Sequence, residues 1–116
     1  MVYSEGILKE PSKKLNITII ELYLVDNIMS VYYVYILEVA GKNGKKRFYT
    51  GYTNNLYRRW NEHRKGIGAK FCRGKRVIEL KYFEIHSSRK EAMRRELEIK
   101  SYSRQQKREL INTINV

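Results

Sequence analysis

The stretch Val31–Val39, VYYVYILEV, decides the fold of this chain. It is built from β-branched, aromatic and aliphatic residues with no charge before Glu38, which predicts a central strand that is buried on both faces. A turn follows over Gly41–Gly44, where Asn-Gly is a strong hairpin signal, and Lys45–Tyr52 returns as a second strand. We therefore expect these two strands to form an antiparallel pair.

The remainder of the chain predicts helices around this hairpin. Caps at Thr53–Asn55 and Gly66, and Ser-x-x-Glu/Gln pairs beginning at Ser88 and Ser103, mark the helix ends. The predicted elements are a helix over Leu56–Lys65, a strand over Val77–Ile85, a helix over Arg89–Lys100 and a helix from Ser103 to about Thr113. The order β-β-α-β-α-α predicts a small mixed α/β (α+β) domain with helices packed on a sheet.

The charge of the chain is unevenly distributed. Its 116 residues carry 24 Lys and Arg against 12 Asp and Glu, a net charge of +12. Residues 1–28 hold three lysines against four acidic residues, so residues 29–116 carry +13. This charge favours a polyanionic partner, with nucleic acid first and an anionic membrane surface second. We interpret 29–116 as the domain and 1–28 as an accessory segment, or as the product of a start codon placed too early.

Several classes of protein are excluded or disfavoured by composition. A single cysteine, Cys72, forms no intrachain disulfide, which favours a reducing, intracellular setting, the cytoplasm or the nucleoid. No run of 18 apolar residues predicts a membrane span, and the 11 residues of Leu15–Val25 are interpreted as a strand. Two histidines and one cysteine do not make a standard zinc site. Ten tyrosines against three phenylalanines indicate that some hydroxyls have a role, because buried phenols need partners.

Two charged residues fall on the inward faces of the predicted helices. Leu56, Trp60 and His63 form one helical stripe, and Arg59 lies inside it. Its side chain could snorkel to solvent, pair with a carboxylate or bind a phosphate. In the next helix, Ala92, Met93 and Ile99 form the apolar side, and Glu96 lies among them. A buried carboxylate needs a cation, so Glu96 is either a partner of Arg59 or a metal ligand.

The two strands carry tyrosines whose relative placement depends on the hairpin. A two-residue turn at Asn43-Gly44 pairs Tyr35 with Tyr52 and turns Tyr49 to the opposite face. A loop with an odd number of residues, or a bulge, places Tyr35 and Tyr49 together. The sequence leaves both registers open.

Taken together, these blocks resemble the GIY-YIG endonuclease superfamily over about residues 31–111, and most closely its small stand-alone branch. The motifs are Tyr33-Val34-Tyr35, Tyr49-Thr50-Gly51, Leu56-x-x-Arg59 and the later inward Glu, with the loop Gly66–Gly74 and the run Glu91–Glu96. Residues Tyr33, Val34 and Thr50 depart from the family motifs. The resemblance implies a three-stranded antiparallel sheet flanked by helices, and divalent-metal-dependent cleavage of phosphodiester bonds.

The resemblance also implies roles for individual residues. Tyr35 matches the general base or water activator, Tyr49 the tyrosine that orients the water, Arg59 the arginine on the scissile phosphate, His63 a nearby histidine and Glu96 the carboxylate for Mg²⁺ (or Mn²⁺). Magnesium needs only one or two protein carboxylates, so a single Glu suffices. A free tyrosine has a pKa of about 10, and Arg59 with the metal would have to stabilise its phenolate.

Basic residues around the loop after the first helix are interpreted as the nucleic-acid-binding surface. They are Lys65, Lys70, Arg73, Lys75 and Arg76. Such residues contact phosphates without reading bases, so binding should be salt-sensitive. We predict a metal-dependent endonuclease acting on DNA, with a role in DNA repair or processing. The alternative is a non-catalytic nucleic-acid-binding module on the same fold. No amphipathic helix with an exposed apolar face supports a membrane-surface role.

Overall fold

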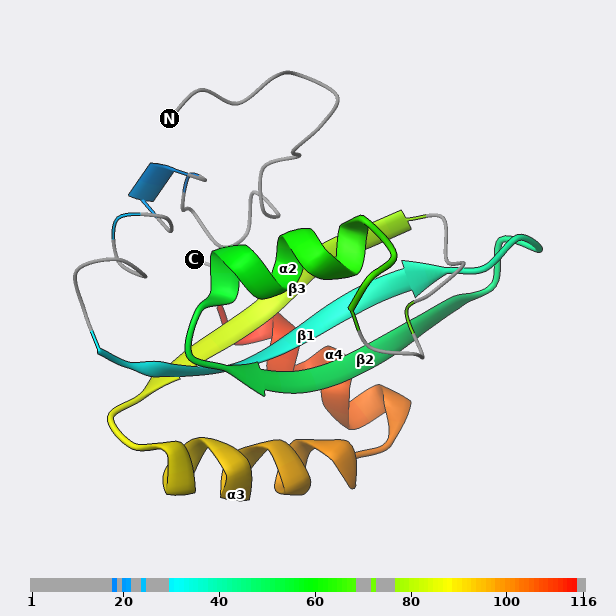
Figure 1. Ribbon diagram of the computed structural model, residues 1–116. Helices are drawn as coiled ribbons and strands as arrows, with labels where there is room; N and C mark the ends of the chain where they lie inside the picture. The colour runs from blue at the N-terminus through cyan, green and yellow to red at the C-terminus, as the bar shows by residue number, and fades with distance from the viewer. Residues whose placement is uncertain are drawn as a thin grey trace.

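A computed structural model of the chain shows a three-stranded sheet flanked by helices (Figure 1). It describes Thr18, Ile20, Glu21, Leu24, residues 30–68, Cys72 and residues 77–114. The elements are β1 (Tyr32–Ala40), β2 (Lys46–Thr53), α2 (Leu56–Arg64), β3 (Val77–His86), α3 (Arg89–Lys100) and α4 (Arg104–Asn112). This order confirms the predicted β-β-α-β-α-α arrangement, and the bounds of these six elements are within one residue of those predicted.

Strand β1 is the centre of the sheet, as its composition predicts. The strand order is β2-β1-β3, and both pairs are antiparallel. Val34, Ile36 and Leu37 are fully buried because both faces of β1 are covered. Helix α2 packs on the face that carries Leu37, while α3 packs on the opposite face, where it meets Val34 and Ile36 together with the Ile111 side chain of α4 (Figure 1). The two helical layers therefore share one central strand.

The hairpin loop between β1 and β2 contains three residues, Lys42–Gly44. The Gly41 N–H donates to the Lys45 carbonyl (3.1 Å), and the Gly44 N–H donates to the Gly41 carbonyl (2.9 Å). Gly44 has a φ of +78°, a conformation that glycine adopts without strain. This odd loop pairs β1 and β2 so that Tyr35 lies opposite Gly51 and Leu37 opposite Tyr49. Tyr35 and Tyr49 therefore lie on the same face of the sheet.

Capping residues lie at the helix ends that the sequence predicts. The Asn55 side chain accepts a hydrogen bond from the first turn of α2 (2.9 Å), and Gly66, with φ +78°, follows the last turn. Ser88 caps α3. Ser103 and Gln106 form a complete capping box for α4. Each cap satisfies backbone groups that the helix itself leaves unpaired.

The predicted strand over Leu15–Val25 is wrong at the residues that the structure describes. Ile20, Glu21 and Leu24 are helical. The Glu21 N–H donates to the Thr18 hydroxyl (3.0 Å), and the Thr18 N–H donates to the Glu21 carboxylate (3.1 Å). This is a Thr-x-x-Glu capping box, a local signal that outweighs the β-propensity of the surrounding Ile and Leu residues.

The double burial of β1 yields a stability prediction. Ile36→Ala removes a fully buried side chain and should lower the free energy of unfolding by about 2–5 kcal/mol. The matched control is Ile85→Ala on the neighbouring strand, where the side chain is 52% exposed. Its effect should stay within about 1 kcal/mol. Urea unfolding monitored by circular dichroism measures both, and equal losses in the two variants would contradict a core centred on β1.

Candidate active site

A buried tyrosine–histidine pair lies at the centre of the candidate site. The Tyr35 hydroxyl oxygen is 2.9 Å from Nε2 of His63, and both residues are at most 1% exposed. Tyr35 comes from the middle of β1. His63 comes from the inward stripe of α2, whose predicted members Leu56, Trp60 and His63 are all buried. The structure thus joins two residues that are 28 positions apart in the sequence.

The protonation states of this pair follow from its burial. Burial raises the pKa of Tyr35, the neighbouring Tyr49 adds to this increase, and the charge of Arg59 opposes it. Burial, together with the nearby charge of Arg59, lowers the pKa of His63 to about 4. At neutral pH the phenol is therefore protonated and the imidazole is neutral, and in the Nδ1–H tautomer of His63 the Tyr35 hydroxyl donates to Nε2. The charge of Arg59 lowers the pKa of Tyr35, as the sequence predicts, but the opposite effect of burial is larger.

Tyr49 completes a cluster of three rings on the α2 face. Its ring centre is 6.4 Å from that of Tyr35 and 5.3 Å from that of His63. Burial raises the pKa of Tyr49, Cys72 and Glu96 raise it further, and Arg59 lowers it. The charges of Arg59 and Glu96 thus act on the same hydroxyl group.

Two glycines allow these rings to pack closely. A Cβ atom at Gly51 would lie 2.6 Å from the Tyr35 hydroxyl oxygen and 3.2 Å from Cε2 of Tyr49. A Cβ atom at Gly68 would lie 2.4 Å from Nδ1 of His63. The Tyr35 ring therefore lies over Gly51 in the opposite strand, and Gly68, in the loop after α2, lies directly against the His63 ring. Sequence analysis left the role of Gly51 open and did not predict that of Gly68.

Arg59 is held at the edge of this cluster by a carboxylate of its own helix. Its NH1 atom is 3.0 Å from Glu62 Oε1, and its side chain is 33% exposed against 56% for Arg58. Burial would lower the pKa of Arg59, but the hydrogen bond to Glu62 and the proximity of Tyr35 raise it. Arg59 therefore keeps its charge. Sequence analysis missed Glu62, although its i,i+3 spacing from Arg59 is a recognisable signal.

Glu96 is a half-buried carboxylate on the opposite helical layer. Its side chain is 14% exposed and lies 3.6 Å from the Lys100 ammonium. The alternative of an Arg59–Glu96 salt bridge is wrong, because the ion pairs of the described residues join each of the two to its own helix. The prediction that Met93 belongs to the apolar side is also wrong: its side chain is 44% exposed because it points away from the Ala92–Ile99 stripe.

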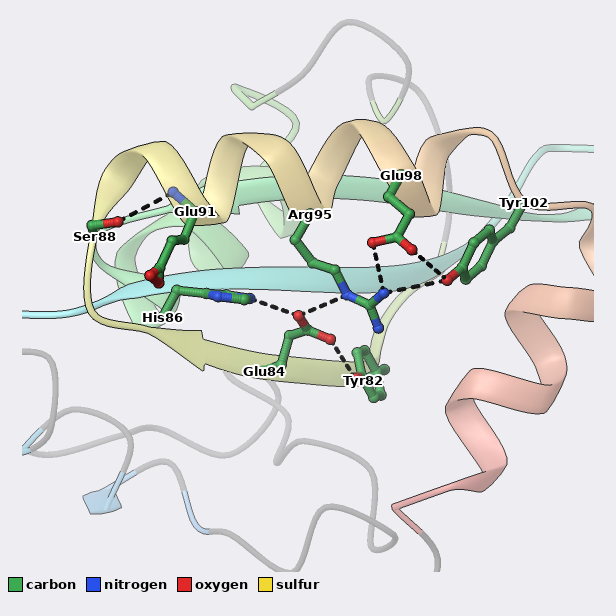
Figure 2. A network of polar contacts seen from close by, with 8 residues as sticks. All are labelled: Tyr82, Glu84, His86, Ser88, Glu91, Arg95, Glu98 and Tyr102. Atoms are coloured by element: carbon green, nitrogen blue, oxygen red, sulfur yellow. Dashed lines mark hydrogen bonds and ion pairs between the residues drawn. The ribbon is translucent and has the colours of Figure 1, made fainter.

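The direction of the Glu96 side chain follows from the orientation of α3 about its own axis. Ala92 and Ile99 face the sheet, and at about 100° per residue Arg95 lies about 50° to one side of them and Glu96 about 50° to the other. Arg95 reaches Glu84 on β3, 2.9 Å away (Figure 2). Because β2 and β3 are opposite edges of the sheet, Glu96 is directed toward β2, the strand that carries Tyr49.

A network of polar contacts between β3 and α3 fixes this orientation of the helix (Figure 2). The Glu84 carboxylate accepts from the Tyr82 hydroxyl (2.5 Å) and from Arg95, and lies 2.6 Å from Nε2 of His86. Burial would raise the pKa of Glu84, but the hydrogen bonds from Tyr82 and Arg95 hold it below its usual value. Arg95 also donates to Glu98 (3.0 Å) and to Tyr102 (3.2 Å). The network ties β3 to α3 over almost two helical turns.

The donor set suits a hydrated divalent cation rather than a closed protein cage. Among the described residues, no three His, Cys, Asp or Glu side chains converge on one point. The Glu62 carboxylate is already paired with Arg59, and Glu96 is the carboxylate directed toward the β2 edge. Mg²⁺ usually keeps several waters and takes one or two carboxylates together with phosphate oxygens, so this arrangement fits Mg²⁺ or Mn²⁺.

A cationic cavity adjoins the site through Arg59. Its volume is about 390 Å³, and its lining residues are Tyr32, Tyr52, Thr53, Asn54, Arg58, Arg59 and Arg89. Three guanidinium groups suit it to phosphate oxygens. Tyr35, Tyr49 and Glu96 do not line it, so the cavity lies beside the ring cluster and does not enclose it.

The predicted basic surface is described only in part. Lys65 is exposed directly after the last turn of α2. Lys70, Arg73, Lys75 and Arg76 lie outside the described residues. Cys72, interpreted from sequence as a small loop residue, is 1% exposed and packs in the same cluster as Tyr35. In the part of the chain that is described, no helix has the length and apolar character to cross a membrane.

Comparisons with known proteins point to one family. A family model described as the GIY-YIG catalytic domain matches residues 31–109. A UPF0213 protein of Staphylococcus haemolyticus is 46% identical over 83 residues, 72% of this chain and 96% of that protein. A UPF0213 protein of Haloquadratum walsbyi is 44% identical over 79 residues, 68% of this chain and 84% of that protein. The solution NMR structure of a UPF0213 protein from Bacillus halodurans aligns with a TM-score of 0.43 at 40% identity, covering 72% and 84% of the two chains.

The packing of Tyr35 over Gly51 predicts the effect of one added methyl group. Gly51→Ala should displace the Tyr35 ring, weaken its hydrogen bond to His63 and destabilise the fold by about 1–3 kcal/mol. The control is Gly41→Ala, where the new Cβ would meet only the Asn43 side chain, at 3.3 Å. NMR shifts of the two aromatic rings and urea unfolding measure the change. Undisturbed Tyr35 and His63 signals in Gly51→Ala would disprove the close approach.

The low pKa of His63 predicts a pH dependence of stability. The unfolded chain binds a proton at His63 near pH 6.5, while the folded chain binds it only near pH 4. The contribution to stability is complete above pH 6.5 and decreases as the pH falls toward 4. His63→Gln removes the titrating group, so its free energy of unfolding should fall less between pH 7.5 and 5 than that of the wild type. Urea unfolding at both pH values, and an imidazole ring that stays neutral by NMR at pH 5, test this expectation.

Proposed function

This chain belongs to the GIY-YIG family of nuclease catalytic domains, among its small stand-alone members, and we propose that it is a divalent-metal-dependent endonuclease that hydrolyses phosphodiester bonds in DNA. The observation that carries the proposal is the buried Tyr35–His63 pair, with the Tyr49 ring packed against it at an angle and Arg59 at its edge. A phenol, a neutral imidazole and a charged guanidinium together supply a proton acceptor and a phosphate ligand.

In the proposed reaction, Tyr35 activates the attacking water. The raised pKa of Tyr35 disfavours a standing phenolate at neutral pH. Instead, the Tyr35 oxygen takes a proton from the water while its own proton passes to Nε2 of His63, 2.9 Å away. The hydroxide forms a bond to phosphorus, and the bond from phosphorus to the leaving sugar oxygen breaks. The proton held by His63 is then released to solvent or to the leaving oxygen.

The other residues of the site hold the phosphate and orient the water. Arg59 remains charged beside Tyr35 and donates to the non-bridging phosphate oxygens, a geometry that its planar fork matches. The Tyr49 hydroxyl positions the water. Glu96 would hold Mg²⁺ or Mn²⁺, which when bound would stabilise negative charge on the phosphate and the leaving oxygen.

The basic surface supports nucleic acid as the substrate. The net charge of +13 over residues 29–116, together with the exposed Lys65 and the cavity lined by Arg58, Arg59 and Arg89, favours backbone contacts with little base recognition. We propose DNA as the substrate, repair or processing as the setting and the cytoplasm as the location. We also propose that residues 29–116 form the nuclease domain and residues 1–28 an accessory segment. Cleavage rates on single-stranded, duplex, flap and branched DNA, with matched RNA, test the choice of substrate.

Two substitutions test the chemistry. Purified protein should cleave DNA with Mg²⁺ and stop when the metal is chelated. Tyr35→Phe should lower the rate by about 10²–10⁴-fold, because the residual ring cannot accept a proton, and Glu96→Gln should reduce it to background by weakening metal binding. Glu91→Gln is the control, since Glu91 is exposed on the same helix and loses the same charge. Thermal unfolding establishes that each variant is folded.

The results of these experiments distinguish an enzyme from a non-catalytic binding module. Cleavage that persists in both Tyr35→Phe and Glu96→Gln would indicate another site or a contaminating nuclease. Salt-dependent DNA binding by the wild type, with no metal-dependent cleavage of any substrate, would instead identify a non-catalytic module on the same fold.

A further inference from the structure

A second cationic cavity lies at the opposite end of β2 from the Arg59 cavity. Its volume is about 270 Å³, and its lining residues are Arg47, Phe48, Tyr102, Arg104 and Lys107. We refer to these five residues as the β2–α4 pocket. Three of the five carry positive charge, and no carboxylate lines the pocket. Glu38 lies opposite Phe48 in the sheet but is not part of the lining.

The walls of the β2–α4 pocket are held in place by contacts with one another and with neighbouring residues. The Arg104 guanidinium stacks on the Phe48 ring at 5.0 Å, and its NH1 donates to the Lys46 carbonyl (3.1 Å). The Tyr102 hydroxyl is turned toward Arg95 (3.2 Å), as Figure 2 shows. Arg104 and Tyr102 are therefore preorganised, which reduces the entropy lost when a ligand binds.

The positive charges of the β2–α4 pocket have no carboxylate partner among the described residues. In the described part of the chain, no ion pair involves Arg47, Arg104 or Lys107. Lys107 is half-buried, and burial followed by the charge of Lys100 lowers its pKa. Converging like charges disfavour one another, and an anion in the pocket removes that cost.

The position of the pocket relates it to the candidate site. Arg47 precedes Tyr49 by two residues and Thr53 by six, which at about 3.3 Å per residue places the two cavities about 20 Å apart along β2. Phe48 and Tyr102 pack on the α3–α4 face of the sheet and Tyr49 on the α2 face, so the two cavities are related along the β2 edge. Lys100 lies between the pocket and Glu96. Its ammonium is 3.6 Å from the Glu96 carboxylate, and its charge lowers the pKa of Lys107.

We propose that the β2–α4 pocket is a phosphate-binding subsite that holds the nucleic-acid backbone several nucleotides from the scissile phosphate. The inference rests on the proposed function, which places the scissile phosphate at Arg59 and Tyr35. A nucleic-acid strand that binds both cavities runs along β2, which is an edge of the sheet. Duplex strands carry one phosphate per about 3.4 Å of axis, so the 20 Å interval spans about six nucleotides.

The test compares two double variants with equal loss of charge. Arg47→Gln/Lys107→Gln removes two charges of the pocket, while Arg94→Gln/Arg108→Gln removes two exposed charges elsewhere on α3 and α4. The dissociation constant of a fluorescent 20-base-pair DNA duplex is measured by anisotropy over a range of NaCl concentrations, with EDTA present. The slope of log Kd against log[NaCl] should fall by about two in the pocket variant and by much less in the control. Equal falls would overturn the proposal in favour of diffuse attraction.

A second arm distinguishes backbone phosphate from free phosphate. Inorganic phosphate is titrated into the wild-type protein while the side-chain N–H signal of Arg104 is followed by NMR, and the DNA duplex is then added. Displacement of phosphate by the duplex supports the proposal. Phosphate that stays bound at Arg104 in the presence of duplex would identify a free-anion site and overturn it.

Metal-dependent cleavage by the wild type is measured separately. A reduced salt slope in the pocket variant without any cleavage leaves the subsite standing and rejects the nuclease. Cleavage with an unchanged slope in the pocket variant rejects the subsite and leaves the nuclease standing.

Discussion

The hydrogen-bond register between β1 and β2 is the constraint on which the rest of the structure depends. A shift of one residue would turn Tyr49 to the other face, because side chains alternate along a strand. The loop of Lys42–Gly44 fixes the register that places Tyr35 opposite Gly51. Only a glycine leaves room for the phenol there. Helix α2 then brings His63 and Arg59 to the same face.

The opposite helical layer contributes through its orientation. The pairing of Arg95 with Glu84 holds α3 to β3, and the adjacent residue, Glu96, is consequently directed to the β2 edge. The negative charge of Glu96, on the helix that covers the opposite face, thereby raises the pKa of the Tyr49 hydroxyl. Burial explains the chemistry of the pair at the centre: it raises the pKa of Tyr35 and lowers that of His63, so that neutral partners share one proton.

Two cavities of the domain are lined by positively charged side chains. One cavity joins the α2 and α3 layers near Arg59, and the β2–α4 pocket opens at the other end of β2. Both contain guanidinium groups and tyrosine rings, and Tyr49 and Gly51 lie on the strand between them. In the proposal, the positively charged residues of both cavities bind a phosphate backbone that runs along the β2 edge of the sheet.

The sequence by itself determined the order and bounds of the elements, the central place of β1 and the inward positions of Arg59, His63 and Glu96. These depend on caps, breaks and periodicity, which act within a few residues. Tertiary structure decided that Tyr35 and Tyr49 share a face, that Arg59 pairs with Glu62 and that Gly68 lies against His63. These features depend on loop geometry and on contacts between distant segments, where several arrangements satisfy the same local pattern and packing selects one of them.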